Sequence, residues 1–281
     1  MTGRSWAKFL PSVLLLCTPL MGTPPAALIV DNSSDSVTVT AATNLQAYLT
    51  AAGYSPVTIN SGVPGSLGTY AQIWDVRYQV ALSGSDVTAY LAYLSGGGSL
   101  FLMGENDNAL FAARDALIAS FIGTAGGGTV TVSTTTNSAD LQTVQPPFTG
   151  PNTLATVTFQ AIGAFTAIGN GSKISVDAAN LPGALVFPPG TLSNAPTGTL
   201  IAVLDVNFLY DPVSTSGEIN FAKNLIAYLA APTPLGPSVP TLSTWAMILL
   251  AAGLMVVGFA RLRGWTTASG RMGRSGAPAR C

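Results

Sequence analysis

The chain has 281 residues, of which 48% are hydrophobic and 8% charged, and it contains 30 Gly, 19 Pro, 2 Cys and no His. Its charged fraction lies far below the roughly 25% of an average soluble domain, which argues against an ordinary cytosolic enzyme. The section from Ala27 to Pro240 contains only four basic residues but all twelve acidic residues of the chain, so its formal charge is −8. Because an acidic body repels phosphate backbones, we expect no nucleic-acid partner.

The N-terminus has the pattern of a secretory signal peptide. Arg4 and Lys8 precede an apolar run over residues 9–20, and small and turn-forming residues follow up to Ala27. This order of charge, apolar core and small residues predicts a signal peptide over residues 1–26 and export of the mature chain. The alternative, a buried N-terminal helix, is disfavoured by two prolines in the apolar run.

From residue 27 onward, short apolar runs alternate with helical patterns. Continuous apolar runs between turn signals predict buried strands. The predicted strands are 27–31, 56–60, 72–75, 99–103 and 199–205. The second of these is expected near a sheet edge, because Pro56 cannot donate to the ladder. Apolar residues three and four apart predict helices at 41–52, 86–94, 107–122 and 219–229.

Two details of these helices are also predicted. Ser85 is a plausible N-cap for the helix over 86–94. The helix over 107–122 is expected to turn Leu110, Leu117 and Phe121 toward the core.

A β-rich section interrupts the alternation after Gly126. Residues 129–133 alternate cleanly between polar and apolar side chains, and residues 154–159 nearly do so. Such runs predict half-exposed strands. We therefore predict one exported α/β domain over residues 27–231, with a doubly wound, mainly parallel sheet and a β-rich insertion.

This domain resembles the class I glutamine amidotransferase-like, flavodoxin-like superfamily. The segments that carry the resemblance are 27–31, 73–77, 97–106, 204–208 and 224–228. The resemblance implies a fold and not an activity. Amidotransferases use a Cys nucleophile and a His base, whereas the predicted exported domain has no Cys and the chain has no His. Glutaminase, Ser-His-Asp hydrolase and His/Cys zinc chemistry are therefore excluded, and a non-catalytic domain is favoured.

Acidic residues lie at or just beyond the carboxyl ends of four of the predicted strands. In an open α/β sheet, ligands bind outside the carboxyl ends of the strands. Carboxylates gathered there repel one another, and a hard cation such as Ca²⁺ or Mg²⁺ would relieve that repulsion. The predicted metal ligands are Asp31, Asp75, Glu105, Asp107 and Asp205. The alternative is that these residues cap helices or pair with Arg77 and Arg114.

Three aromatic residues are candidates for a sugar-stacking surface. Tyr70, Trp74 and Tyr78 lie close together in the sequence around one predicted strand. Aromatic rings can stack on an extracellular glycan, which makes a glycan a candidate partner. The alternative is that they belong to the core.

The C-terminal region predicts a membrane anchor. A Pro-rich linker and a short motif occupy residues 232–241, and the nearly all-apolar stretch 242–260 is close to the roughly 20 residues that cross a bilayer as a helix. Arg261 and Arg263 would stop transfer at the membrane. The tail 261–281 has five arginines and no acid, so the positive-inside rule places it in the cytoplasm. The alternative is a buried core helix.

The same region resembles the bacterial IPTL-CTERM protein-sorting signal, which is related in design to PEP-CTERM signals. The residues that carry the resemblance are Pro240, Thr241, Leu242, Ser243 and Trp245, followed by the apolar span and the arginines. The resemblance implies export and anchoring in the inner membrane by the C-terminal helix. It also implies cleavage by a membrane sorting protease and a final place in the cell envelope or outside the cell.

Two functions are compatible with these patterns. The first is an envelope protein whose non-catalytic domain serves in binding or extracellular matrix assembly. The alternative is a cation-dependent extracellular hydrolase that acts on glycan or peptide through Glu105 and the neighbouring aspartates. Apart from Ca²⁺ or Mg²⁺, no cofactor is predicted. A third possibility is that the C-terminal helix is never cut and simply anchors the domain.

Overall fold

The computed structural model describes residues 23–106, 108–133, 140–212 and 217–230. Its helices and strands lie in the first of two compact units of the chain, Met1–Thr233. The predicted transmembrane helix, sorting motif and basic tail, and most of the predicted signal peptide, lie outside the described residues. Within the described part of the chain, no helix is both long and apolar enough to cross a membrane.

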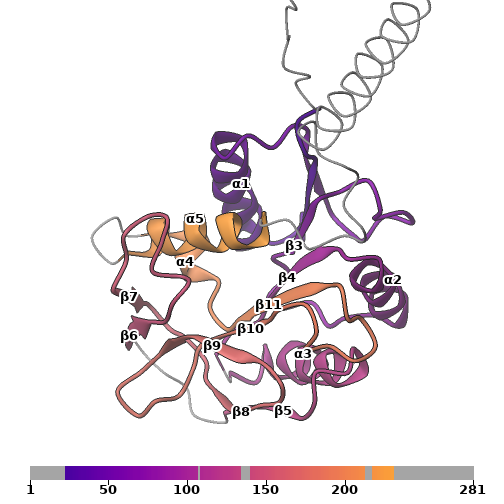
Figure 1. The fold of residues 1–281 in the computed structure, drawn as a ribbon. Helices are drawn as coiled ribbons and strands as arrows, with labels where there is room; N and C mark the ends of the chain where they lie inside the picture. Colours follow the sequence, from indigo (N-terminus) through magenta and orange to yellow (C-terminus); the bar gives the residue numbers. More distant parts are fainter. Residues whose placement is uncertain (1–22, 107, 134–139, 213–216, 231–281) are drawn as a thin grey trace, which may run out of the picture. The chain divides into compact units, whose positions relative to one another are not determined.

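Nine strands form one sheet, in the order β2–β1–β3–β4–β11–β10–β9–β6–β7 (Figure 1). They are β1 (Ala27–Val30), β2 (Val57–Asn60), β3 (Gln72–Asp75), β4 (Ser99–Met103), β6 (Asp140–Val144), β7 (Thr156–Phe159), β9 (Ser172–Val176), β10 (Ala184–Phe187) and β11 (Thr199–Val203). β5 (Val130–Val132) and β8 (Phe165–Ile168) pair separately as an antiparallel ribbon. The apolar runs of β1, β4, β10 and β11 explain why these strands are buried along their whole length.

The sheet is mixed, with a parallel part as predicted and an antiparallel part. β2, β1, β3, β4 and β11 run parallel to one another, and β2 lies at the edge as predicted. β10, β9, β6 and β7 then extend the same sheet through antiparallel pairs. The section predicted as an insertion therefore builds much of the second half of the sheet. Alternating polar and apolar residues indicate a strand, but they do not indicate which strand it will join.

Helices cover both faces of the sheet. They are α1 (Ser36–Ala51), α2 (Gly84–Ser95), α3 (Ala112–Thr124), α4 (Asn207–Tyr210) and α5 (Glu218–Leu229). α1, α4 and α5 contact one another on one side, whereas α2 and α3 lie on the other (Figure 1). This arrangement confirms the α/β class. The chain leaves β1 toward β2 on one side and leaves β3 toward β4 on the other, so the carboxyl ends of β1 and β3 mark the usual ligand-binding position of such sheets.

The helix starts differ from the sequence prediction because capping residues set them. α1 begins at Ser36, five residues before the predicted start, since the Asp35 side chain accepts a hydrogen bond from the Val37 N–H. The N-cap of α2 is Ser83, not Ser85, and it forms a reciprocal capping box with Asp86.

The start of α3, in contrast, was predicted five residues too early, at residue 107. The helix begins at Ala112, so Leu110 lies outside it and is 71% exposed. Its buried face is formed by Ile118, Phe121 and Ile122, together with the polar side chains of Arg114 and Asp115. The prediction was therefore correct for Phe121 and wrong for Leu110.

Candidate functional site

The structure places the four described candidate ligands at the carboxyl edge of the sheet. Asp31 directly follows β1, Asp75 ends β3, Glu105 follows β4 by two residues and Asp205 follows β11 by two. All four are buried, with at most 5% of their surface exposed. The fifth candidate, Asp107, lies outside the described residues.

Asp75 is held by two arginines. Its Oδ2 atom lies 2.7 Å from Arg77 Nη2, and its Oδ1 atom lies 3.2 Å from Arg114 Nη2. The hydroxyl of Tyr90 donates a further hydrogen bond to Oδ2 at 2.9 Å. Asp75 therefore pairs with Arg77 and Arg114, which is the alternative to metal binding that the sequence analysis left open. Its oxygens already accept several charged or polar donors, which leaves little capacity to bind a cation.

The electrostatics agree with this geometry. Burial alone would raise the pKa of Asp75, but the charge of Arg114 and the hydrogen bond and charge of Arg77 outweigh it and lower the pKa to about 2. Burial likewise disfavours the charged form of Arg77, and the hydrogen bond and charge of Asp75 more than compensate, so its pKa is raised. The cluster is thus fully ionised and internally neutralised, as expected of a structural anchor.

Glu105 and Asp205 form a second, uncompensated group. Glu105 Oε1 accepts hydrogen bonds from the backbone N–H and the side-chain amide of Asn106, both at 3.0 Å. Its Oε2 atom accepts the backbone N–H of Val206 at 3.0 Å, which brings the carboxyl beside Asp205. Asp205 Oδ1 accepts the backbone N–H of Asn207 at 2.6 Å, whereas its buried Oδ2 atom accepts none within the described chain.

Burial shifts both of these carboxyls toward the protonated form. It raises the pKa of Glu105 to about 7, and the hydrogen bonds from Asn106 and Val206 oppose the shift only in part. The pKa of Asp205 lies well above its ordinary value, first because of burial and then because of the charge of Glu105. Glu218, a fully buried residue at the start of α5, adds a smaller contribution. The sequence analysis missed Glu218, because an acid in the first turn of a helix is ordinary for capping reasons.

Asp31 stands apart from both groups in its hydrogen bonding. Its backbone N–H donates to the carbonyl of Asn60 at 2.9 Å, which continues the β1–β2 ladder. Burial raises the pKa of its carboxyl, while the charge of Arg77 opposes that shift. Across the described ranges, no group of three or more His, Cys, Asp or Glu side chains is placed to hold a metal ion. Because Asp107 is not among them, the five-residue metal site stays a prediction.

The aromatic candidates belong largely to the core. Trp74 is fully buried and stacks on Phe101 with ring centroids 4.5 Å apart, and its indole N–H donates to the side-chain oxygen of Gln72 at 2.9 Å. Tyr78 is 6% exposed, and Tyr70 is half-buried. The suggested sugar-stacking surface is therefore wrong for Trp74 and Tyr78, because neither ring faces solvent.

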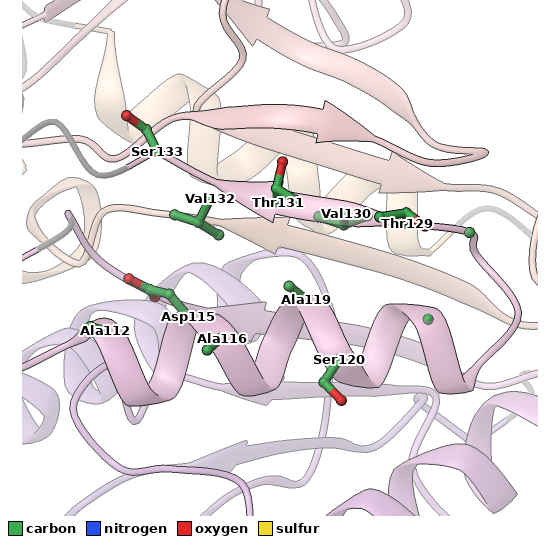
Figure 2. Close-up of a pocket in the computed structure, with 12 residues that line it drawn as sticks. Ala112, Asp115, Ala116, Ala119, Ser120, Thr129, Val130, Thr131, Val132 and Ser133 are labelled. Atoms are coloured by element: carbon green, nitrogen blue, oxygen red, sulfur yellow. The ribbon is translucent and has the colours of Figure 1, made fainter.

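A pocket of about 920 Å³ lies between α3 and β5, and no sequence pattern had indicated it. Small residues of α3 form one wall, and the strand segment 128–133 forms the other. Figure 2 shows Val132 pointing toward the helix, and Ala119 and Asp115 pointing toward the strand. The spacing of Ala112, Ala116, Ala119 and Gly123 on one helix face is the signal that would have located this wall.

Comparison with known proteins identifies the C-terminal signal. Residues 237–264 match the IPTL-CTERM motif. The motif points to an exported protein that is associated with the cell envelope. No curated protein matches the sequence.

Solved structures resemble the described fold at low sequence identity. The mmIFT52 N-terminal domain aligns with a TM-score of 0.58 and 10% identity, over 76% of this chain and 100% of that domain. A cold-adapted β-galactosidase from Rahnella sp. R3 aligns with a TM-score of 0.50 and 12% identity, over 78% of this chain and 33% of the enzyme. A glutamine amidotransferase from Thermotoga maritima aligns with a TM-score of 0.47 and 6% identity, over 75% of this chain and 100% of that one. These similarities concern the fold alone.

Proposed function

We propose that this protein is exported, is held in the inner membrane by residues 242–260 and displays its α/β domain at the cell surface. The match of residues 237–264 to a sorting motif is the observation that carries the proposal. The signal-peptide pattern over residues 1–26 and the arginine tail support the same topology. In this proposal, a membrane sorting protease cuts near Pro240 and Leu242 and releases the domain into the envelope or the medium.

The displayed domain serves in binding or extracellular matrix assembly, not in catalysis. This part of the proposal is supported by the burial and pairing of the acidic side chains at the carboxyl edge of the sheet, where open α/β folds bind their ligands. Asp75 is neutralised by Arg77 and Arg114, and Glu105 and Asp205 are almost completely shielded from solvent. A general acid or base must reach its substrate within hydrogen-bond distance, and these buried groups offer little surface for such contact.

Mass spectrometry of the mature protein in cell fractions tests the proposal. We expect the wild-type domain outside the cytoplasm, with an N-terminus near residue 27 and a C-terminus at or before the Pro240–Leu242 segment. Replacing both Pro240 and Leu242 with alanine should leave the C-terminal helix attached and keep the protein with the membrane. The matched control, Pro234→Ala in the preceding linker, should be processed normally. Recovery of the full chain in the cytosol would contradict the proposed export.

A further inference from the structure

We propose that Asn170, in the turn between β8 and β9, is a site of spontaneous deamidation, and that its conversion to aspartate releases this turn from the loop that follows α3. Deamidation is a covalent modification that needs no catalytic side chain, only water and the backbone of the chain itself. The proposal does not depend on the proposed export or sorting.

The residue that follows Asn170 selects this position. Asn170 precedes Gly171, and no other asparagine in the sequence precedes a glycine. Deamidation begins when the backbone nitrogen of the next residue attacks the side-chain Cγ atom of the asparagine. A side chain on that next residue hinders the attack, and glycine has none. Among the thermolabile asparagines of the chain, Asn170 is therefore the one at which the attack meets the least steric hindrance.

The reaction uses water and releases ammonia. Hydroxide removes the proton of the Gly171 N–H, and the nitrogen then bonds to Cγ of Asn170. The Cγ–Nδ2 bond breaks, and the leaving nitrogen takes a proton from water, which restores the hydroxide and closes a succinimide ring. A water molecule opens the ring at either of its carbonyls and leaves aspartate or isoaspartate. No atom is oxidised or reduced in these steps.

The turn gives water access to Asn170 but holds the attacking nitrogen. Asn170 is exposed and Gly171 is half-buried. The Asn170 side-chain amide makes two long hydrogen bonds, to the carbonyls of Gly126 and Thr191, both at 3.4 Å. The Gly171 N–H donates to the Ile168 carbonyl at 3.0 Å, and this bond must open before the nitrogen can attack. The reaction therefore proceeds through local opening of the turn and is slow in the folded protein.

The backbone of the turn packs directly against the loop that follows α3. The Asn170 N–H donates to the Gly127 carbonyl at 2.7 Å, and a Cβ atom added at Gly169 would collide with the same oxygen. On the other side of the loop, the Ser193 N–H donates to the Gly126 carbonyl at 3.3 Å. Three segments of the chain thus meet at one place, hereafter the loop junction. They are 126–128, 169–171 and 191–194.

Deamidation replaces a hydrogen-bond donor in the loop junction with an acceptor. The Nδ2 amide of Asn170 faces two carbonyl oxygens, whereas an aspartate would place a carboxylate, which only accepts, against the same oxygens. Isoaspartate would also lengthen the backbone of a turn that has no space beside Gly127. Gly128 lies in the same loop and lines the pocket between α3 and β5. Release of the loop junction therefore loosens the wall of that pocket formed by residues 128–133.

Peptide mass spectrometry of the full-length chain, aged in nonionic detergent at mildly alkaline pH, tests the modification. We expect a mass increase of about 1 Da in the peptide that contains Asn170, at a rate that rises in proportion to the hydroxide concentration. Asn180 is the internal control, because it is also exposed in a turn but precedes Leu181. Asn170→Gln should abolish the mass increase, since its longer side chain disfavours the ring. Deamidation of Asn170 that is no faster than that of Asn180 would overturn the proposal.

The Asn170→Asp variant tests the release of the loop junction. We expect its melting temperature to fall by about 2–4 °C, the shift for a loss of one or two hydrogen bonds in a domain of this size. Hydrogen exchange at the amides of Ser193 and Asn194 should become faster, because both donate to the loop that follows α3. The control Asn180→Asp adds the same charge at an exposed position and should shift the melting temperature by less than about 1 °C.

The aged wild-type protein provides the same measurement without a substitution. After deamidation, it should show the faster exchange at Ser193 and Asn194, and this result decides the matter if Asn170→Asp does not fold. Exchange at these amides that stays unchanged in the folded variant, or in wild-type protein whose Asn170 has been deamidated, would refute the release of the loop junction.

Discussion

Replacing Arg114 with methionine removes the buried cation that joins α3 to β3. Arg114 has no exposed surface, and its Nη2 atom lies 3.2 Å from Asp75 Oδ1. Its Nε donates to the Met103 carbonyl at 2.9 Å, and its Nη1 donates to the Val80 carbonyl at 3.1 Å. Methionine preserves most of the apolar stem but leaves both carbonyls without this donor and Asp75 without one of its two ion pairs.

The expected loss is large for a single substitution. Removing one partner of a buried ion pair costs about 3–5 kcal/mol in free energy of unfolding, because the remaining charge stays buried. Since Arg77 still pairs with Asp75, we expect the lower end, about 3 kcal/mol. Lys223→Met, on the exposed face of α5, is the matched control and should change the free energy by less than about 0.5 kcal/mol.

Urea unfolding of the full-length chain in nonionic detergent, followed by circular dichroism, measures these differences. Combining Arg114→Met with Asp75→Asn should cost less than the sum of the two single losses, with a coupling of about 1–3 kcal/mol. If Arg114→Met unfolded at the urea concentration of the wild type, or if the two losses simply added, the assignment of this cluster as a structural anchor would be refuted.

The dependence of the free energy of unfolding on pH under acidic conditions provides a second test of the Asp75–Arg77–Arg114 cluster. The pKa of Asp75 is about 2 in the folded protein against an ordinary value of 3.8, so the cluster contributes about 2 kcal/mol above pH 3.8. That contribution should be lost as the pH falls from 3.8 toward 2. Without Arg114 the pKa of Asp75 rises, and the wild-type protein should therefore lose more stability than the variant over this interval.

Three further outcomes are expected. The buried side-chain amide of Asn224 donates to the carbonyls of Phe148 and Asn152, both at 2.8 Å, so Asn224→Ala should lower the free energy of unfolding in urea by about 2 kcal/mol. The control Asn220→Ala removes only a 3.4 Å hydrogen bond at the surface and should lower it far less. Gly126→Ala should destabilise the fold by more than about 2 kcal/mol, because the added Cβ would lie 2.6 Å from the backbone nitrogen of Ser193. The control Gly53→Ala would meet no atom within 4 Å and should cost about 1 kcal/mol, which reflects its positive φ alone. If the predicted carboxylate site holds a cation, millimolar Ca²⁺ or Mg²⁺ should raise the melting temperature of the wild type and not of Asp31→Asn, and an unchanged melting temperature would remove that site.

The parallel half of the fold could be predicted from the sequence because its signals are local. The apolar run at Ala27–Val30 and the turn at Gly53, which has a φ of +93°, indicate a buried strand and the end of a helix without reference to the rest of the chain. The antiparallel half could not be placed, since β6 and β7 join the sheet only through β9, which lies later in the sequence. Such pairings depend on partners far apart in the chain, and periodicity does not specify them.

The sequence predicted where in the sheet the acidic residues lie, but it did not predict which of them are ionised or what they contact. The rule for open α/β sheets correctly led to Asp75 and Glu105 at the carboxyl edge. It did not distinguish their environments, because the neutralising Arg114 comes from a helix 39 residues further along the chain and Glu105 has no such partner among the described residues. Glu218, which lies still further along, adds to the charge around Asp205. Three-dimensional contacts, not residue types, decide which carboxyl is ionised.

The compartment of the α/β domain tests the account most directly. A reporter enzyme that is active only outside the cytoplasm can be fused after Ala230 in one strain and after Cys281 in another. We predict activity from the fusion after Ala230 and none from the fusion after Cys281, because the proposed topology places the domain outside the cytoplasm and the arginine tail inside it. An inactive fusion after Ala230, with the domain recovered from the cytosol, would contradict the account.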